Sequence, residues 1–82
     1  MKYLLLGAGL QGTAIAFDLL RCAPGTQAVT VVDADEAALA RLRDRLADPR
    51  LATLAADVRD RERLEPLLRA ADVVISAVNY WY

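Results

Sequence analysis

Apolar residues follow two alternating patterns along the chain. Four short continuous apolar runs are separated by three longer stretches in which apolar residues recur at helical spacing. The predicted strands are residues 3–6, 28–32, 51–55 and 72–77. The predicted helices occupy residues 10–21, 33–48 and 57–71. Because the strands carry apolar residues at successive positions, we expect a parallel sheet covered on both faces.

Each predicted helix has one apolar side. The expected inward residues are Gly12, Ile15, Ala16, Leu19 and Leu20, then Leu39, Leu42 and Leu46, then Leu64, Leu67, Leu68 and Ala71. Asp35 is expected to cap the second helix. Pro66 interrupts the third stretch, because proline lacks a backbone N–H and clashes with the preceding turn. We therefore expect a loose turn over residues 60–63, with regular helix starting close to Pro66.

The order of elements, β-α-β-α-β-α-β, predicts an α/β fold. Parallel strands joined by right-handed crossovers give the strand order 3-2-1-4. This is a Rossmann-type parallel sheet, the first half of a doubly wound fold plus one strand beyond the reversal. Residues 1–82 are therefore expected to form one domain.

Composition excludes several classes of protein. The chain has ten basic and eleven acidic side chains, so no basic excess indicates nucleic-acid or membrane binding. It contains no histidine for a catalytic relay, and the single Cys22 supports neither an internal disulfide nor a thiolate metal cluster. The apolar N-terminal run stops at Gly7, too short for a signal peptide. A cytoplasmic location is expected.

Three of the four glycines lie in the sequence Gly7-Ala8-Gly9-Leu10-Gln11-Gly12, between a predicted strand and a helix. In a dinucleotide site, Gly7 permits the tight turn, Gly9 admits the pyrophosphate, and Gly12 brings the helix close to the sheet. Free N–H groups near Leu10 and Gln11 would face the phosphates. A turn that only packs helix on strand would explain Gly7 and Gly12, but not Gly9.

Asp33 ends the second predicted strand, near the offset expected for a ribose-binding acid. Its carboxylate could accept both adenosine ribose hydroxyls and would repel a 2′-phosphate. The next residue is Ala34 rather than the arginine that would pair with that phosphate. The sequence therefore predicts NAD rather than NADP, although Arg41 could reach back from its helix and leaves NADP open.

Two more segments are candidates for cofactor contact. Asp57 could accept from the adenine amine and Val58 could cover the ring, or Asp57 is simply a solvated turn acid. Small residues at Ser76, Ala77 and Val78 would leave space for the nicotinamide ribose, or they only terminate a strand.

The chain resembles the N-terminal cofactor domain of the saccharopine dehydrogenase and L-lysine dehydrogenase family. The likeness is carried by Met1–Ala16, Val32–Asp35, Ala56–Val58 and Asp72–Val78. Members commonly have proline at the position of Asn79, and NADP-using members have arginine at that of Ala34. The resemblance implies an enzyme that oxidises an amino acid or amine and passes hydride to the nicotinamide. It also implies a cytoplasmic homo-oligomer with a second, substrate-binding domain.

The aromatic ending Tyr80-Trp81-Tyr82 suggests that residues 1–82 are a fragment of a longer two-domain enzyme. No catalytic residue can be assigned, and Cys22 is expected to be a packed or surface thiol. Two other functions stay open: a nucleotide-sensing domain like those that regulate potassium uptake, and a half-Rossmann scaffold with vestigial binding.

Overall fold

The computed structural model describes residues 1–22 and 24–77, and it confirms the predicted order of elements. The elements are β1 (Lys2–Leu6), α1 (Leu10–Arg21), β2 (Ala28–Asp33), α2 (Glu36–Leu46), β3 (Leu51–Ala55), α3 (Arg61–Ala70) and β4 (Val73–Ser76). All strand pairs are parallel, and the strand order is β3-β2-β1-β4. The fold is thus the predicted Rossmann-type α/β arrangement.

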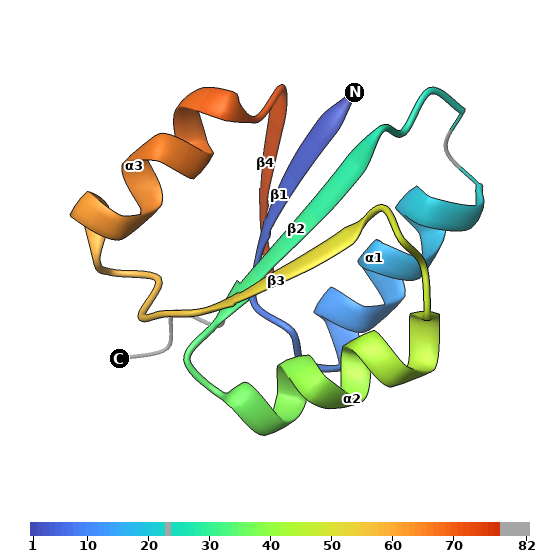
Figure 1. Cartoon of the computed structure of the whole chain (residues 1–82), viewed down its shortest axis with the longest axis horizontal. Helices are drawn as coiled ribbons and strands as arrows, with labels where there is room; N and C mark the ends of the chain where they lie inside the picture. The colour runs from blue at the N-terminus through green and yellow to red at the C-terminus, as the bar shows by residue number, and fades with distance from the viewer. Residues whose placement is uncertain (23, 78–82) are drawn as a thin grey trace.

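The sheet separates two layers of helix. Figure 1 shows α1 and α2 together on one side of the sheet and α3 on the other. Leu5, Val29 and Val31 point into the core beneath α1 and α2. Leu4 and Val32 point to the opposite face, where they pack with Leu64 of α3. The strands are therefore apolar at successive positions because both faces of the sheet are covered.

The strand register brings four chain segments to one edge of the sheet. Leu6, the last residue of β1, pairs with Val32 of β2 and with Ser76 of β4. Asp33, the last residue of β2, pairs with Ala55 of β3. The segments that follow all four strands therefore begin side by side at the carboxyl edge, where open α/β sheets bind their ligands.

The third helix differs from the prediction, because regular helix begins at Arg61 and includes Pro66. The Asp60 carboxylate starts the helix by accepting a hydrogen bond from the backbone N–H of Arg63, at 3.3 Å. Pro66 removes one hydrogen bond, to the carbonyl of Glu62, and the remaining bonds hold the helix.

The predicted inward sides of α1 and α2 are confirmed, whereas that of α3 is correct only in part. Leu64 is buried, and Leu67 and Ala71 are half-buried against the same core. Leu68 is 39% exposed. Among the strands, α3 makes its main contacts with β1.

Arg50 joins three segments at the amino edge of the sheet, just before β3. Its guanidinium donates to both carboxylate oxygens of Asp48, with the Nη2 contact at 2.8 Å. The same group donates to the carbonyl oxygen of Leu20, in the last turn of α1, at 2.6 Å. The Arg50 side-chain hydrogen bond is the main cause that lowers the pKa of Asp48 to about 2.

We expect Asp48→Asn to destabilise the protein at pH 7, because it removes an ionised acceptor from Arg50. A carboxyl whose folded pKa is lowered stabilises the fold above its unfolded pKa of 3.8 and loses this effect as pH falls through about 2. Urea unfolding of both proteins should therefore show a stability difference that is constant from pH 7 to 5 and shrinks below pH 4. In an Arg50→Gln background the same substitution should have a smaller effect with a weaker pH dependence, because only the backbone N–H of residue 50 still donates to the Asp48 carboxylate. A difference that grows on acidification would contradict this assignment.

Candidate dinucleotide-binding site

The turn from β1 into α1 requires glycine at its first position. Gly7 is buried and has a φ of 109°, a region that side chains other than glycine rarely adopt. Its backbone N–H donates to the carbonyl oxygen of Val32 at 2.8 Å, which continues the sheet by one bond past β1. The turn is therefore fixed to the end of β2 as well as to its own strand.

Gly12 is required by close packing. A Cβ on Gly12 would lie 2.1 Å from the carbonyl oxygen of Gly7 and 2.8 Å from its carbonyl carbon. Both atoms belong to a backbone that is itself held by the sheet, so they cannot move aside easily. This contact brings the first turn of α1 directly against the end of β1.

Gly9 is not required by the protein itself. Its φ of −65° is open to any residue, and a Cβ placed on it would meet nothing within 4 Å. Neither backbone strain nor packing therefore explains a glycine here. A group that approaches the backbone from outside, such as a diphosphate, would explain it.

The amino end of α1 has no side-chain cap, in contrast with the other two helices. Gly9 is its N-cap residue and offers no side-chain acceptor, and the first turn carries no acidic residue. The Asp35 carboxylate accepts from Ala37 and Ala38 in α2, and that of Asp60 accepts from α3. The first N–H groups of α1 thus face the carboxyl edge with the positive end of the helix dipole behind them.

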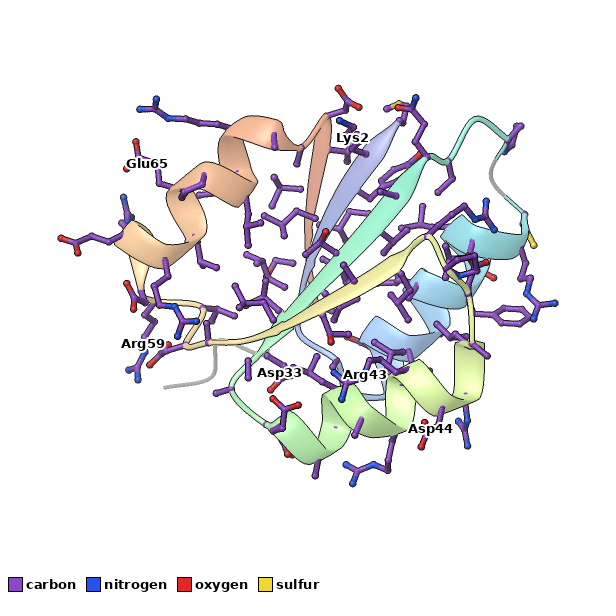
Figure 2. All side chains as sticks on the ribbon, viewed as in Figure 1. Lys2, Asp33, Arg43, Asp44, Arg59 and Glu65 are labelled. Atoms are coloured by element: carbon purple, nitrogen blue, oxygen red, sulfur yellow. The ribbon has the colours of Figure 1, made fainter. Side chains whose placement is uncertain are left out.

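Asp33 points toward the glycine turn. Its Oδ2 accepts a hydrogen bond from the backbone N–H of Ala8 at 2.8 Å, and its Oδ1 accepts from the N–H of Asp35 at 2.8 Å. Figure 2 shows Asp33 at the end of the sheet, near the starts of α1 and α2. The side chain is half-buried, and an ionised carboxylate has about four acceptor positions. Two of these stay available for ribose hydroxyls.

Of the two residues that follow Asp33, Ala34 only separates the strand from the helix, and Asp35 caps α2. Ala34 is exposed and places no charge beside the Asp33 carboxylate. Asp35 caps α2 through hydrogen bonds of 3.0 and 3.2 Å from Ala37 and Ala38, as the sequence predicted.

Asp57 follows β3 and forms an ion pair with Arg59. Its two oxygens accept from Nε and Nη2 of Arg59, at 3.1 and 2.9 Å. The Arg59 side chain, followed by its backbone N–H, lowers the pKa of Asp57, so the carboxyl is an acceptor at neutral pH. Both partners are exposed, so this ion pair is weak enough to be exchanged for another donor. Val58 is half-buried against the core beneath α3.

On the other side of β1, Ala77 contacts the glycine turn. Its backbone N–H donates to the carbonyl oxygen of Leu6 at 2.8 Å, and its Cβ would lie 3.9 Å from a Cβ on Gly12. Ser76 is exposed at the end of β4. Val78 lies outside the described residues.

A hollow of about 610 Å³ opens beside the glycine turn, between α1 and α2. It is lined on the turn side by Ala8, Gly9 and Thr13, and on the α2 side by residues that include Arg41 and Arg45. The sequence indicated Arg41 only as a side chain that could reach back, and it gave Arg45 no role. Their spacing of four residues, which places them on the same side of α2, was the signal that could have identified both.

These observations define a dinucleotide-binding domain of the Rossmann type. A family model described as the saccharopine dehydrogenase NADP binding domain matches residues 3–82. The chain belongs to this family, which confirms the resemblance found in the sequence. Among the described residues, no helix is long and apolar enough to span a membrane.

The glycines offer a matched pair of substitutions. Gly12→Ala should lower the free energy of unfolding by about 1–3 kcal/mol or more, because its Cβ would overlap the Gly7 backbone. Gly9→Ala should change it by about 0.5 kcal/mol or less, because the added atom enters open space. Urea denaturation followed by circular dichroism measures both. Equal losses in the two variants would contradict the packing described for this turn.

Proposed function

We propose that this domain binds NAD in preference to NADP, as the cofactor domain of an amino-acid or amine dehydrogenase. The observation that supports this most directly is Gly9, whose missing side chain leaves space that the protein does not use. That space adjoins the uncapped start of α1. The Asp33 carboxylate accepts a hydrogen bond from the backbone N–H of Ala8 in the same turn. A diphosphate joined to a ribose matches these features.

In the proposed complex, the diphosphate lies over the backbone N–H groups of Leu10 and Gln11. Asp33 accepts hydrogen bonds from the adenosine ribose hydroxyls. Asp57 accepts from the exocyclic amine of adenine, in place of part of its contact with Arg59, and Val58 lies beside the ring. Ser76 and Ala77 adjoin the nicotinamide ribose across the switch point between β1 and β4.

The preference for NAD follows from charge. A phosphate on the ribose 2′-oxygen would lie close to the carboxylate of Asp33, and Ala34 provides no cation to offset the repulsion. The family description names NADP, so the preference proposed for this chain rests on Asp33 and Ala34 alone.

The proposed reaction is hydride transfer between the substrate and the nicotinamide. When bound, the cofactor accepts a hydride from the carbon that bears the amine. The described residues provide binding and orientation, and none of them is proposed as the group that moves the proton. We propose that a substrate-binding domain of a longer, homo-oligomeric enzyme provides that group. The match to a dehydrogenase family favours this function over nucleotide sensing without chemistry.

We expect Asp33→Asn to weaken NADH binding by about tenfold or more, because hydrogen bonds from the ribose to a charged acceptor become weaker and because asparagine has one acceptor oxygen for the two backbone N–H groups that Asp33 holds. NADPH binding should stay the same or become tighter, because the repulsion is removed. Asp35→Asn is the matched control: it removes the same charge two residues away, and asparagine caps helices as well as aspartate does. NADH fluorescence titration measures all three proteins.

Two results would overturn the proposal in different ways. Equal or tighter binding of NADPH than of NADH by the unsubstituted chain would contradict the preference for NAD. An equal loss of NADH affinity in both variants would mean that Asp33 acts through general charge and not through ribose contacts.

A further inference from the structure

The peptide unit that joins Ala8 to Gly9 is held by the protein at its carbonyl and free at its N–H. The Ala8 carbonyl oxygen accepts a hydrogen bond from Oγ1 of Thr13, in the first turns of α1, at 3.2 Å. The unit is trans and planar, so its other polar group, the Gly9 N–H, points away from that carbonyl. Within residues 1–22 and 24–77, no protein group accepts from the Gly9 N–H. The Thr13 hydroxyl therefore sets the direction of a donor that the described protein does not use.

Glycine at position 9 makes such a restraint necessary. Glycine adopts positive φ about as readily as negative φ, so the peptide unit that precedes it can flip. After a flip, the partially negative Ala8 carbonyl oxygen would take the place of the Gly9 N–H. The hydrogen bond from the Ala8 N–H to Asp33 fixes the preceding peptide unit and leaves this rotation open. The residue that gives the turn its open space thus also gives it freedom to present the wrong group.

The position of Thr13 in α1 brings its hydroxyl to the turn. Its backbone N–H donates to the carbonyl oxygen of Gly9 at 2.8 Å, as an early bond of the helix. Its side chain is half-buried and lines the hollow beside Ala8 and Gly9. A residue without a hydroxyl at position 13 would keep the helical bond to Gly9 and lose only the restraint on Ala8.

We propose that Thr13 is a positioning residue for the diphosphate: it holds the peptide unit so that the Gly9 N–H, and not the Ala8 carbonyl, is presented to the ligand. This inference rests on the proposed function, because it needs a diphosphate at the glycine turn. A threonine hydroxyl has one proton, and here the Ala8 carbonyl takes it. An ionised diphosphate has only acceptors, so Thr13 acts through the turn and does not donate to the ligand itself.

The test compares NADH dissociation constants by fluorescence titration, with circular dichroism to verify the fold of each variant. Thr13→Val and Thr13→Ala should each weaken binding by about three- to tenfold, and Thr13→Ser, which keeps the hydroxyl, should stay within about twofold of the unsubstituted chain. Thr26→Val is the matched control, because the Thr26 hydroxyl donates to the carbonyl oxygen of Leu19 at 2.9 Å, toward the other end of α1. It should lower stability in urea and leave NADH affinity within about twofold.

A second measurement reports on the turn itself. In heteronuclear NMR of the isotopically labelled chain, saturating ADP should shift the amide signal of Gly9, and should shift it less in Thr13→Val. Adenosine, which carries no phosphate, should leave this signal nearly unchanged and should bind all the variants equally well.

Several outcomes would overturn the role of Thr13. Unchanged NADH affinity in Thr13→Val and Thr13→Ala would do so, as would a loss in Thr13→Ser as large as that in Thr13→Val. An equal loss in Thr26→Val, or equal losses for adenosine and ADP in Thr13→Val, would mean that the hydroxyl only stabilises the fold.

The failure of the proposed function gives a different result. If the unsubstituted chain binds neither NADH nor ADP, the dinucleotide function is wrong, and the role of Thr13 is wrong with it. If the chain binds both ligands and the Gly9 amide signal does not move with ADP, the dinucleotide function stands and only the role of Thr13 is wrong.

Discussion

The hydrogen bond from the Ala8 N–H to the Asp33 carboxylate joins the two halves of the proposed site. One half is the glycine turn, which belongs to β1 and α1, and the other is the end of β2. Asp33 also accepts from the N–H of Asp35, so a single carboxylate fixes both the turn and the entry into α2. In the proposed complex, the distance between the phosphate and the ribose would therefore be set by the protein before the ligand arrives, which would lower the ordering cost of binding.

The glycine turn can hold this position because its other contacts are made by backbone. Gly7 is bonded to Val32, and Gly12 leaves no room for even one carbon atom between α1 and the end of β1. These contacts lock the start of α1 against the sheet. Gly9 faces outward with no atom against it. The same short loop is therefore rigid at Gly7 and Gly12 and open at Gly9.

Sequence patterns were sufficient for most of the fold. Continuous apolar strands and the glycine turn predicted the parallel sheet, its order and the edge where the site lies, because each depends on local residue types. The start of α3 was predicted wrongly, since Pro66 was given more weight than the cap provided by Asp60. Leu68 was predicted to face inward because its spacing is helical, whereas it is 39% exposed.

The site was harder to predict because its parts come from turns of different elements. Gly7, Gly9 and Gly12 are recognisable within one motif, and Asp33 is found from its position after a strand. The bond between Asp33 and Ala8 has no sequence signature, since any residue with a backbone N–H could provide the donor. The hollow beside it depends on the distance between α1 and α2, which apolar spacing alone does not give.

In the proposed complex, the choice of cofactor depends on the residues at the end of β2. Asp33 lies where the ribose would be in the proposed complex, so its negative charge would act at short range, and Ala34 adds no cation to offset it. Helix α2 follows the end of β2. Its residues Arg41 and Arg45 line the hollow that Ala8 and Gly9 also line. In the proposed complex, discrimination between the two dinucleotides would depend on the repulsion between Asp33 and a 2′-phosphate, which no neighbouring cation at position 34 offsets.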